Sequence, residues 1–215
     1  MAAKSAKPKG GKAQPTVSDK ESLLVCDNLN NGLQILFPDD FEELLERIRG
    51  EYDRSYMHWR PHINIVWPFI SGRLCSSAQQ ESLARVLGST PPFSLRFDGS
   101  SLQVRASPSK KPTAASRAYI VLVPTVEPAD AISSLKARVK REMRLHQVRQ
   151  SDPHLTIAQL PVGDASAFIA TWRQLLFPAS APSTVIPVEH LHWVSRSPGV
   201  LRGQSIRQFW LGIRS

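Results

Sequence analysis

Two short segments decide the fold: residues 61–65 read PHINI, and residues 153–157 read PHLTI. Each starts with a proline, which disfavours a helix at the preceding residue, and continues with alternating polar and apolar residues. Successive side chains of a strand point to opposite faces, so each segment is predicted to bury its aliphatic side chains and to present its histidine together with the residue two positions later. The four side chains predicted to face a common cleft are His62, Asn64, His154 and Thr156.

These residue types suit the chemistry of a phosphodiester. A neutral imidazole can take a proton from the attacking oxygen while a protonated imidazole gives one to the leaving oxygen. Both forms are accessible near neutral pH because the unperturbed pKa of histidine is about 6.5. The amide or hydroxyl beside each histidine can hydrogen-bond the phosphoryl oxygens as charge builds on them. The scheme uses His62 and His154 as acid and base, in either order, and calls for no metal and no cofactor.

The apolar periodicity around these segments predicts an irregular succession of elements. Helices are predicted from Asp39 or Asp40, whose side chain would cap the helix, and at residues 77–87, 128–143 and 165–177. Strands are predicted at residues 33–37, 62–67, 93–97, 102–105, 119–123, 154–160, 185–194 and 206–213. An Asp-Gly turn at residues 98–99 predicts that the third and fourth strands form a hairpin. Because each half contains a helix, a proline and a strand starting with histidine, we expect an α+β protein with two sheet-containing lobes.

Composition limits the classes of protein and partner. The chain has 215 residues, a net charge of +9 and a pI near 10.0, and we expect residues 21–215 to form one bilobal domain, as a monomer. Its positive charge favours a polyanionic partner, RNA or a nucleotide. The alternative is a basic protein that has no such partner. No segment has the ~20 apolar residues of a membrane span. Residues 1–20 are predicted to be a basic disordered tail without a signal sequence, in a cytoplasmic protein, with nuclear or mitochondrial alternatives.

The segments PHINIVWPF (residues 61–69) and PHLTIAQL (residues 153–160) resemble the paired His-x-Thr/Ser-x motifs of the two-histidine phosphoesterase superfamily. This superfamily includes 2′-5′ RNA ligase-like proteins and 2′,3′-cyclic phosphodiesterases. The two histidines are 92 positions apart, which fits its usual spacing, and the resemblance extends over about residues 30–213. It implies a bilobal α+β fold in which two antiparallel sheets face a central cleft, with helices outside. It also implies phosphate binding by Asn64 and Thr156, although threonine or serine is usual at the position of Asn64.

Three residues beside the first motif are candidate substrate contacts. Trp67 and Phe69 would either stack on a base or pack between the lobes. Arg60 would either reach a phosphate or pair with Asp53 or Glu51 at the surface.

The sequence therefore predicts a metal-independent phosphodiesterase that acts on RNA or nucleotides, at a 2′,3′-cyclic phosphate or a 2′-5′ linkage. A non-catalytic module that binds RNA or nucleotides in the same cleft is the alternative. Turnover of a 2′,3′-cyclic nucleotide in the presence of a chelator separates the two hypotheses.

Overall fold

The computed structural model describes residues 24–25, 29–71, 74–106, 117–146, 148–149, 151–197 and 199–212; the predicted tail at residues 1–20 and Cys26 lie outside these ranges. In chain order the elements are β1 (Leu24–Val25), β2 (Asn31–Leu36), α2 (Asp39–Tyr52), β3 (His62–Val66), α3 (Ser77–Gly88), β4 (Phe93–Asp98), β5 (Leu102–Ala106), β6 (Arg117–Leu122), β7 (Thr125–Glu127), α4 (Ala131–Glu142), β8 (Leu145–His146), β9 (Leu155–Pro161), the 3₁₀ turn η1 (Val162–Asp164), α5 (Ala165–Leu176), β10 (Ser183–Val188), β11 (His190–Ser195) and β12 (Gln204–Trp210). All four expected helices are present. Within the described ranges, no helix has both the length and the apolar composition needed to cross a bilayer.

The described strands form three antiparallel sheets and one short parallel pair. The four-stranded sheet has the order β12-β11-β2-β3, and a three-stranded sheet has the order β5-β6-β9. These two sheets carry the two histidine motifs, at β3 and at the start of β9, so the predicted α+β class is confirmed. The third antiparallel sheet, β10-β4-β7, was not predicted.

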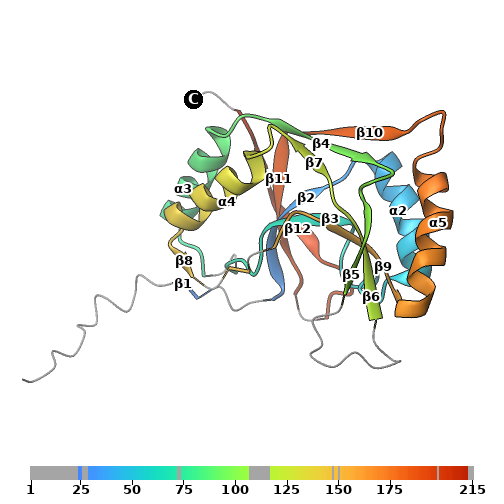
Figure 1. The fold of residues 1–215 in the computed structure, drawn as a ribbon. Coiled ribbons are helices and arrows are strands. Elements are labelled where there is room, and N and C mark those ends of the chain that lie inside the picture. The colour runs from blue at the N-terminus through green and yellow to red at the C-terminus, as the bar shows by residue number, and fades with distance from the viewer. Residues whose placement is uncertain are drawn as a thin grey trace, which may run out of the picture.

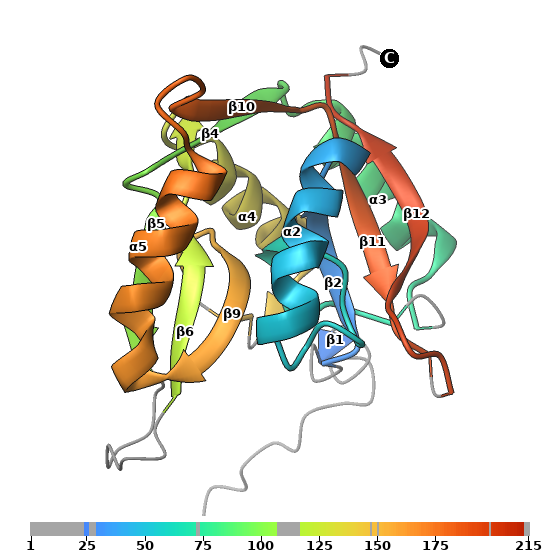
Figure 2. The same ribbon diagram turned by 90° about the vertical axis from the view of Figure 1, so that its right-hand side faces the viewer.

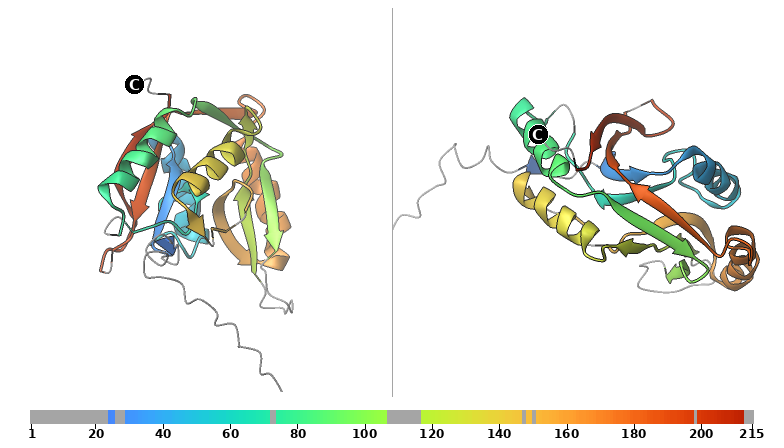
Figure 3. Two further views of the ribbon diagram at one scale, coloured as in Figure 1. Left: turned by 90° about the vertical axis from the view of Figure 1, so that its left-hand side faces the viewer. Right: turned by 90° about the horizontal axis from the view of Figure 1, so that it is seen from above.

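The two motif sheets form two lobes, which lie side by side in Figure 2. The first lobe consists of the β12-β11-β2-β3 sheet with α3 and α4 packed on its outer face, as Figure 1 and Figure 3 show. The second lobe consists of the β5-β6-β9 sheet with α5 against it. The β10-β4-β7 sheet runs across one end of both lobes (Figure 2). Neither lobe is a continuous stretch of chain, because β11 and β12 return from the C-terminal part to pair beside β2.

The hairpin predicted at residues 93–105 is wrong, although its turn forms. The backbone N–H of Ser100 donates to Oδ1 of Asp98 at 2.8 Å, as in a tight turn. However, β4 pairs with β10 and β7, whereas β5 pairs with β6, so the two strands enter different sheets. The turn residues set only the local change of direction. Partners from distant parts of the chain bury the apolar face of β4 and thereby decide its pairing.

The predicted aspartate cap of α2 is also wrong. Pro38 occupies the cap position and makes no side-chain cap bond. Oδ1 of Asp40 instead accepts from the backbone N–H of the next residue, Phe41, at 2.8 Å. The acidic side chains of this first turn still favour the helix through its dipole.

The aliphatic residues of both motifs enter one continuous hydrophobic core. Ile63 and Ile65 of the first motif, and Leu155 and Ile157 of the second, are at most 1% exposed and belong to the same cluster of buried side chains. The lobes therefore share a core, and each motif strand is fixed by packing on its apolar side.

A buried polar link also joins the lobes. α2 contacts β9, and near the end of this helix Arg49 pairs with Asp53, with 3% and 1% of their side chains exposed. Nε of Arg49 donates to Oδ2 of Asp53 at 2.9 Å. Oδ1 of Asp53 accepts from Nε2 of Gln159, on β9 of the second lobe, at 2.9 Å. One carboxylate therefore pairs with the helix arginine, beside Glu46, and also anchors the opposite sheet.

We expect Asp53→Ala to reduce the free energy of unfolding by about 3 kcal/mol, because it removes one of the two carboxylates that pair with the buried Arg49 guanidinium; the other, Oε1 of Glu46, lies 3.2 Å from Nη1 of Arg49. The matched control is Glu43→Ala on the same helix, whose pair with Arg47 is 73% and 70% exposed and should contribute less than about 1 kcal/mol. Urea denaturation measures both values. Equal losses in the two variants would contradict a stabilising role for the buried link.

Candidate active site

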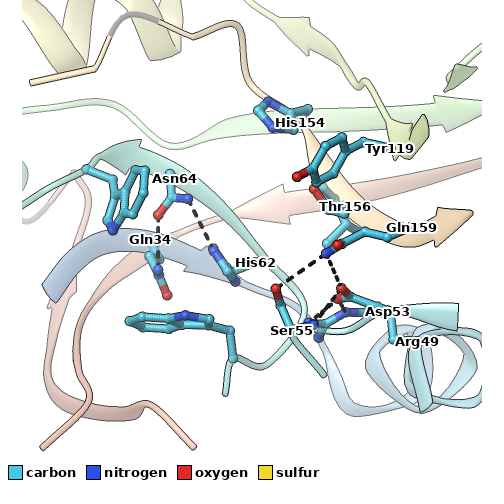
Figure 4. Close-up of a pocket in the computed structure, with 13 residues that line it drawn as sticks. Gln34, Arg49, Asp53, Ser55, His62, Asn64, Tyr119, His154, Thr156 and Gln159 are labelled. Atoms are coloured by element: carbon cyan, nitrogen blue, oxygen red, sulfur yellow. Dashed lines mark hydrogen bonds and ion pairs between the residues drawn. The ribbon is translucent and has the colours of Figure 1, made fainter. Parts of the chain in front are cut away.

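A cavity of about 360 Å³ lies between the lobes and brings the four predicted cleft residues together. Figure 4 shows His62 and Asn64 on β3 across from His154, Tyr119 and Thr156 of the second lobe. The residues that line the cavity are Gln34, Arg49, Asp53, Ser55, Trp59, His62, Asn64, Trp67, Tyr119, His154, Leu155, Thr156 and Gln159.

Both motif strands carry a β-bulge at the same place, three residues after the histidine. In the pairing of β2 with β3, Gln34 lies opposite Asn64 and Leu33 lies opposite Val66, so Ile65 is the extra residue. In the pairing of β6 with β9, Ile157 is the extra residue in the same way. A bulge puts two consecutive side chains on similar sides and re-aims the residues that follow. Trp67 and Gln159, each two residues beyond a bulge, are thereby turned toward the cavity.

The two histidines are held in the same tautomer by equivalent backbone bonds. Nδ1 of His62 donates to the carbonyl oxygen of Arg60, and Nδ1 of His154 donates to that of Asp152, both at 2.7 Å. A carbonyl can only accept, so in the neutral imidazole the proton lies on Nδ1 and the lone pair lies on Nε2. Each ring therefore offers Nε2 as the atom that can exchange a proton.

The amide of Asn64 is oriented by its neighbours on both sides. Its Oδ1 accepts from Nε2 of Gln34 at 3.0 Å, and its Nδ2 lies 3.2 Å from Nε2 of His62, to which it donates. Gln34 itself is 2% exposed. A Cβ at Gly32 would stand 2.8 Å from Nε2 of Gln34, so glycine leaves room for this side chain. Gln34 thus fixes which end of the Asn64 amide points at the imidazole.

Both imidazoles are biased toward the neutral form. Burial is the main cause that lowers the pKa of His62 from 6.5 to about 4, and the positive charge of Arg49 adds to the effect. Burial also lowers the pKa of His154, to which the nearby guanidinium of Arg105 contributes. Nη1 of Arg105 lies 3.2 Å from Nδ1 of His154. A negatively charged phosphate between the rings would oppose these shifts.

The three candidate substrate contacts have different surroundings. Trp67 lines the cavity. Phe69 is fully buried with its ring 5.1 Å from that of Trp193, so it packs in the core and does not reach the cavity. Arg60 does not line the cavity either, and its partner is neither Asp53 nor Glu51: its Nε donates to Oε1 of Glu42 at 2.7 Å. Of the two alternatives expected for Arg60, a phosphate contact or an ion pair, the structure shows an ion pair, with a different carboxylate.

Several lining residues were not predicted from the sequence. Gln34 and Gln159 interrupt otherwise apolar strands, and a polar residue in such a strand is a signal for a cleft or a polar contact. Strict alternation, however, places Gln159 on the face opposite Thr156, and only the bulge at Ile157 brings it to the cavity. Trp59 carries no signal in the sequence beyond its closeness to the first motif.

The chain is similar to a known family and to several solved structures. The sequence model of the 2′-5′ RNA ligase superfamily matches residues 37–199. Among solved structures, E. coli LigT in its apo form is 14% identical with a TM-score of 0.47, over 84% of this chain and 96% of LigT. The protein TT0787 of Thermus thermophilus is 16% identical with a TM-score of 0.49, over 85% of this chain and 97% of that one. No curated protein sequence matches the chain.

We expect acid to destabilise the fold partly through His192, which lies outside the cavity. Burial, aided by the neighbouring His190 and Arg60, lowers the pKa of His192 to about 4. Between pH 6.5 and about 4 the unfolded chain binds a proton that the folded protein excludes, so this contribution to stability is complete above pH 6.5 and is lost as the pH falls. The urea-unfolding free energy of the wild type should therefore drop more over this range than that of His192→Gln. Parallel curves would show that His192 does not contribute.

Proposed function

The chain belongs to the 2′-5′ RNA ligase superfamily, as its two motifs indicated, and we propose that it is a metal-independent phosphodiesterase acting on RNA or nucleotides. Membership supports phosphoesterase or ligase-like chemistry in general. The proposed substrates are more specific: a ribose 2′,3′-cyclic phosphate or a 2′-5′ linkage. In both, an oxygen of the ribose leaves phosphorus or attacks it. A pair of imidazoles can act as general base and general acid in such a step.

The observation that carries this proposal is the matched orientation of the two imidazoles. Both donate Nδ1–H to a backbone carbonyl at 2.7 Å, which leaves Nε2 of each ring for proton transfer in one shared cavity. An amide and a hydroxyl, from Asn64 and Thr156, line the same cavity and can hydrogen-bond phosphoryl oxygens. A cavity of about 360 Å³ lies within the range of small-molecule sites.

His62 is the proposed base and His154 the proposed acid. Burial and the hydrogen bond from Asn64 keep Nε2 of His62 unprotonated, so it can take the proton of an attacking water as the new P–O bond forms. His154 gives its Nε2 proton to the ribose oxygen as the old P–O bond breaks, and the product is a phosphomonoester. Because Arg105 favours the neutral form of His154, it makes the protonated ring a stronger acid.

Asn64 is proposed to move its hydrogen bond during substrate binding. Its Nδ2–H donates to the lone pair on Nε2 of His62. A phosphoryl oxygen can accept the same N–H, which frees Nε2 of His62 for the proton transfer. Gln34 would keep the amide in the correct orientation throughout, acting as a positioning residue.

We expect His62→Ala and His154→Ala each to reduce kcat for a nucleoside 2′,3′-cyclic phosphate at least ~10²-fold, the usual scale for loss of a general acid or base. The assay contains a chelator, and His146→Ala, at an exposed histidine outside the cavity, is the matched control. Tight binding without turnover by the wild type would favour the non-catalytic alternative. Full activity in both histidine variants would refute the mechanism.

The hydrogen-bonding role of Asn64 is tested by three substitutions. Asn64→Thr should retain most activity because a hydroxyl can donate to the phosphate, whereas Asn64→Leu should lose about 2–4 kcal/mol of transition-state stabilisation. Asn64→Asp should also be poor, because a carboxylate only accepts and its charge repels the phosphate. The measurement is kcat/KM on one cyclic phosphate. Equal activity of the Asp and Thr variants would remove Asn64 from the site.

A further inference from the structure

Two of the five tryptophans line the cavity, at opposite ends of the strand that carries His62 and Asn64. Trp59 precedes β3, and Trp67 follows it directly. A strand rises about 3.3 Å per residue, so the four steps from His62 to Val66 span roughly 13 Å. Along this strand the cavity therefore presents an indole, then the proposed catalytic imidazole and the amide proposed to bind the phosphate, and then a second indole.

Each indole is fixed by the surrounding protein. The ring of Trp59 lies 5.8 Å from that of His62, and a Cβ at Gly203 would stand 2.9 Å from its Cε3 and Cζ3 atoms. Glycine at this position therefore allows the backbone to approach the ring closely. The guanidinium of Arg196 lies 5.7 Å from the centroid of Trp59.

Trp67 is held in a comparable way by groups from other parts of the chain. Its indole N–H donates to the carbonyl oxygen of Leu29 at 3.2 Å. The guanidinium of Arg149 lies 4.3 Å from the ring centroid, and the backbone N–H of Arg149 donates to the carbonyl of Trp67 at 3.0 Å. Strict alternation from Ile63 would turn Trp67 toward the core, and the bulge at Ile65 reverses this direction.

We infer that the cavity takes a phosphodiester with a nucleobase on each side, that is, a linkage between two nucleosides of single-stranded RNA, with Trp59 and Trp67 as the two stacking platforms. The inference rests on the proposed function, because it places the phosphate at His62 and His154. Flat indoles suit any base, and such platforms bind unpaired bases that are splayed apart. The strand between the two tryptophans spans roughly 13 Å of backbone, against ~3.4 Å between stacked neighbouring bases, so we expect the two bases to be splayed apart. Arg149 and Arg196 each lie over one face of an indole, so a base would stack on the other face, and their positive charge suits the phosphates of a longer strand.

The kinetic test compares a substrate that has two bases with one that has a single base. A diadenosine monophosphate, in its 2′-5′ and 3′-5′ forms, and adenosine 2′,3′-cyclic phosphate are assayed with Trp59→Ala and Trp67→Ala. Each variant should lower kcat/KM for the dinucleotide roughly 5- to 150-fold, the range that stacking of one base supplies. Only one of the two variants should affect the cyclic mononucleotide. Phenylalanine at either position should restore most of the loss, and Trp210→Ala, at an exposed tryptophan outside the cavity, should change neither substrate.

A binding measurement separates this inference from the proposed function. Isothermal titration uses a diadenosine phosphonate in which a methylene group replaces the ribose oxygen that would leave phosphorus, so that neither water nor a ribose hydroxyl can cleave the probe. If the wild type binds this probe and both alanine variants bind it at least ~5-fold more weakly, the stacking role of the two tryptophans is supported even if no substrate is turned over. If neither tryptophan affects binding or dinucleotide turnover while the cyclic mononucleotide is cleaved, the inference is wrong and the proposed function stands. Equal effects of both variants on both substrates would also overturn it.

Discussion

Arg49 and Asp53 form an ion pair between the lobes, where water has almost no access, and the second oxygen of Asp53 reaches across to Gln159 of the opposite sheet. A buried charge without its partner is strongly unfavourable, so the carboxylate must stay within reach of the guanidinium. Because the ion pair holds the carboxylate in place, the hydrogen bond from Gln159 ties α2 to β9, and with it sets the separation of the two strands that carry the histidine motifs. The rest of the cavity depends on that separation, because proton transfer needs both imidazoles within reach of one substrate.

The two halves of the cavity are built by the same local device. Each histidine follows a proline, donates Nδ1–H to the carbonyl two residues earlier, and stands three residues before a bulge. The backbone bond fixes the tautomer, and the bulge turns later side chains of the strand back toward the cavity. The halves then differ where the chemistry requires it. The first has an amide held by Gln34, and the second has a hydroxyl and a nearby guanidinium, from Thr156 and Arg105.

Much of this arrangement follows from local pattern. The burial of Ile63 and Leu155, and the polar face shared by each histidine with the residue two positions later, follow from the period of a strand. The four helices follow from their apolar stripes. The pairing of β4 and β5 did not follow, because a turn sequence fixes a change of direction but not the partner that buries the strand. The partner of Arg60 was missed for a similar reason: Glu42 lies on a helix that packs beside it, 18 residues earlier in the chain.

The sequence by itself therefore determined the fold class, the family and the two polar pairs that line the cleft. These follow from local patterns: alternation in the strands, helical periodicity of apolar residues, and two short motifs. Tertiary structure alone decided which of the two predicted aromatic side chains, Trp67 or Phe69, reaches the cavity. Trp67 and Phe69 are two positions apart, and strict alternation would bury both on the side of Ile63 and Ile65. The bulge at Ile65 turns Trp67 out, while Phe69 packs on Trp193 in the core. A bulge arises from the register between two paired strands, and that register depends on a partner that is distant in the chain.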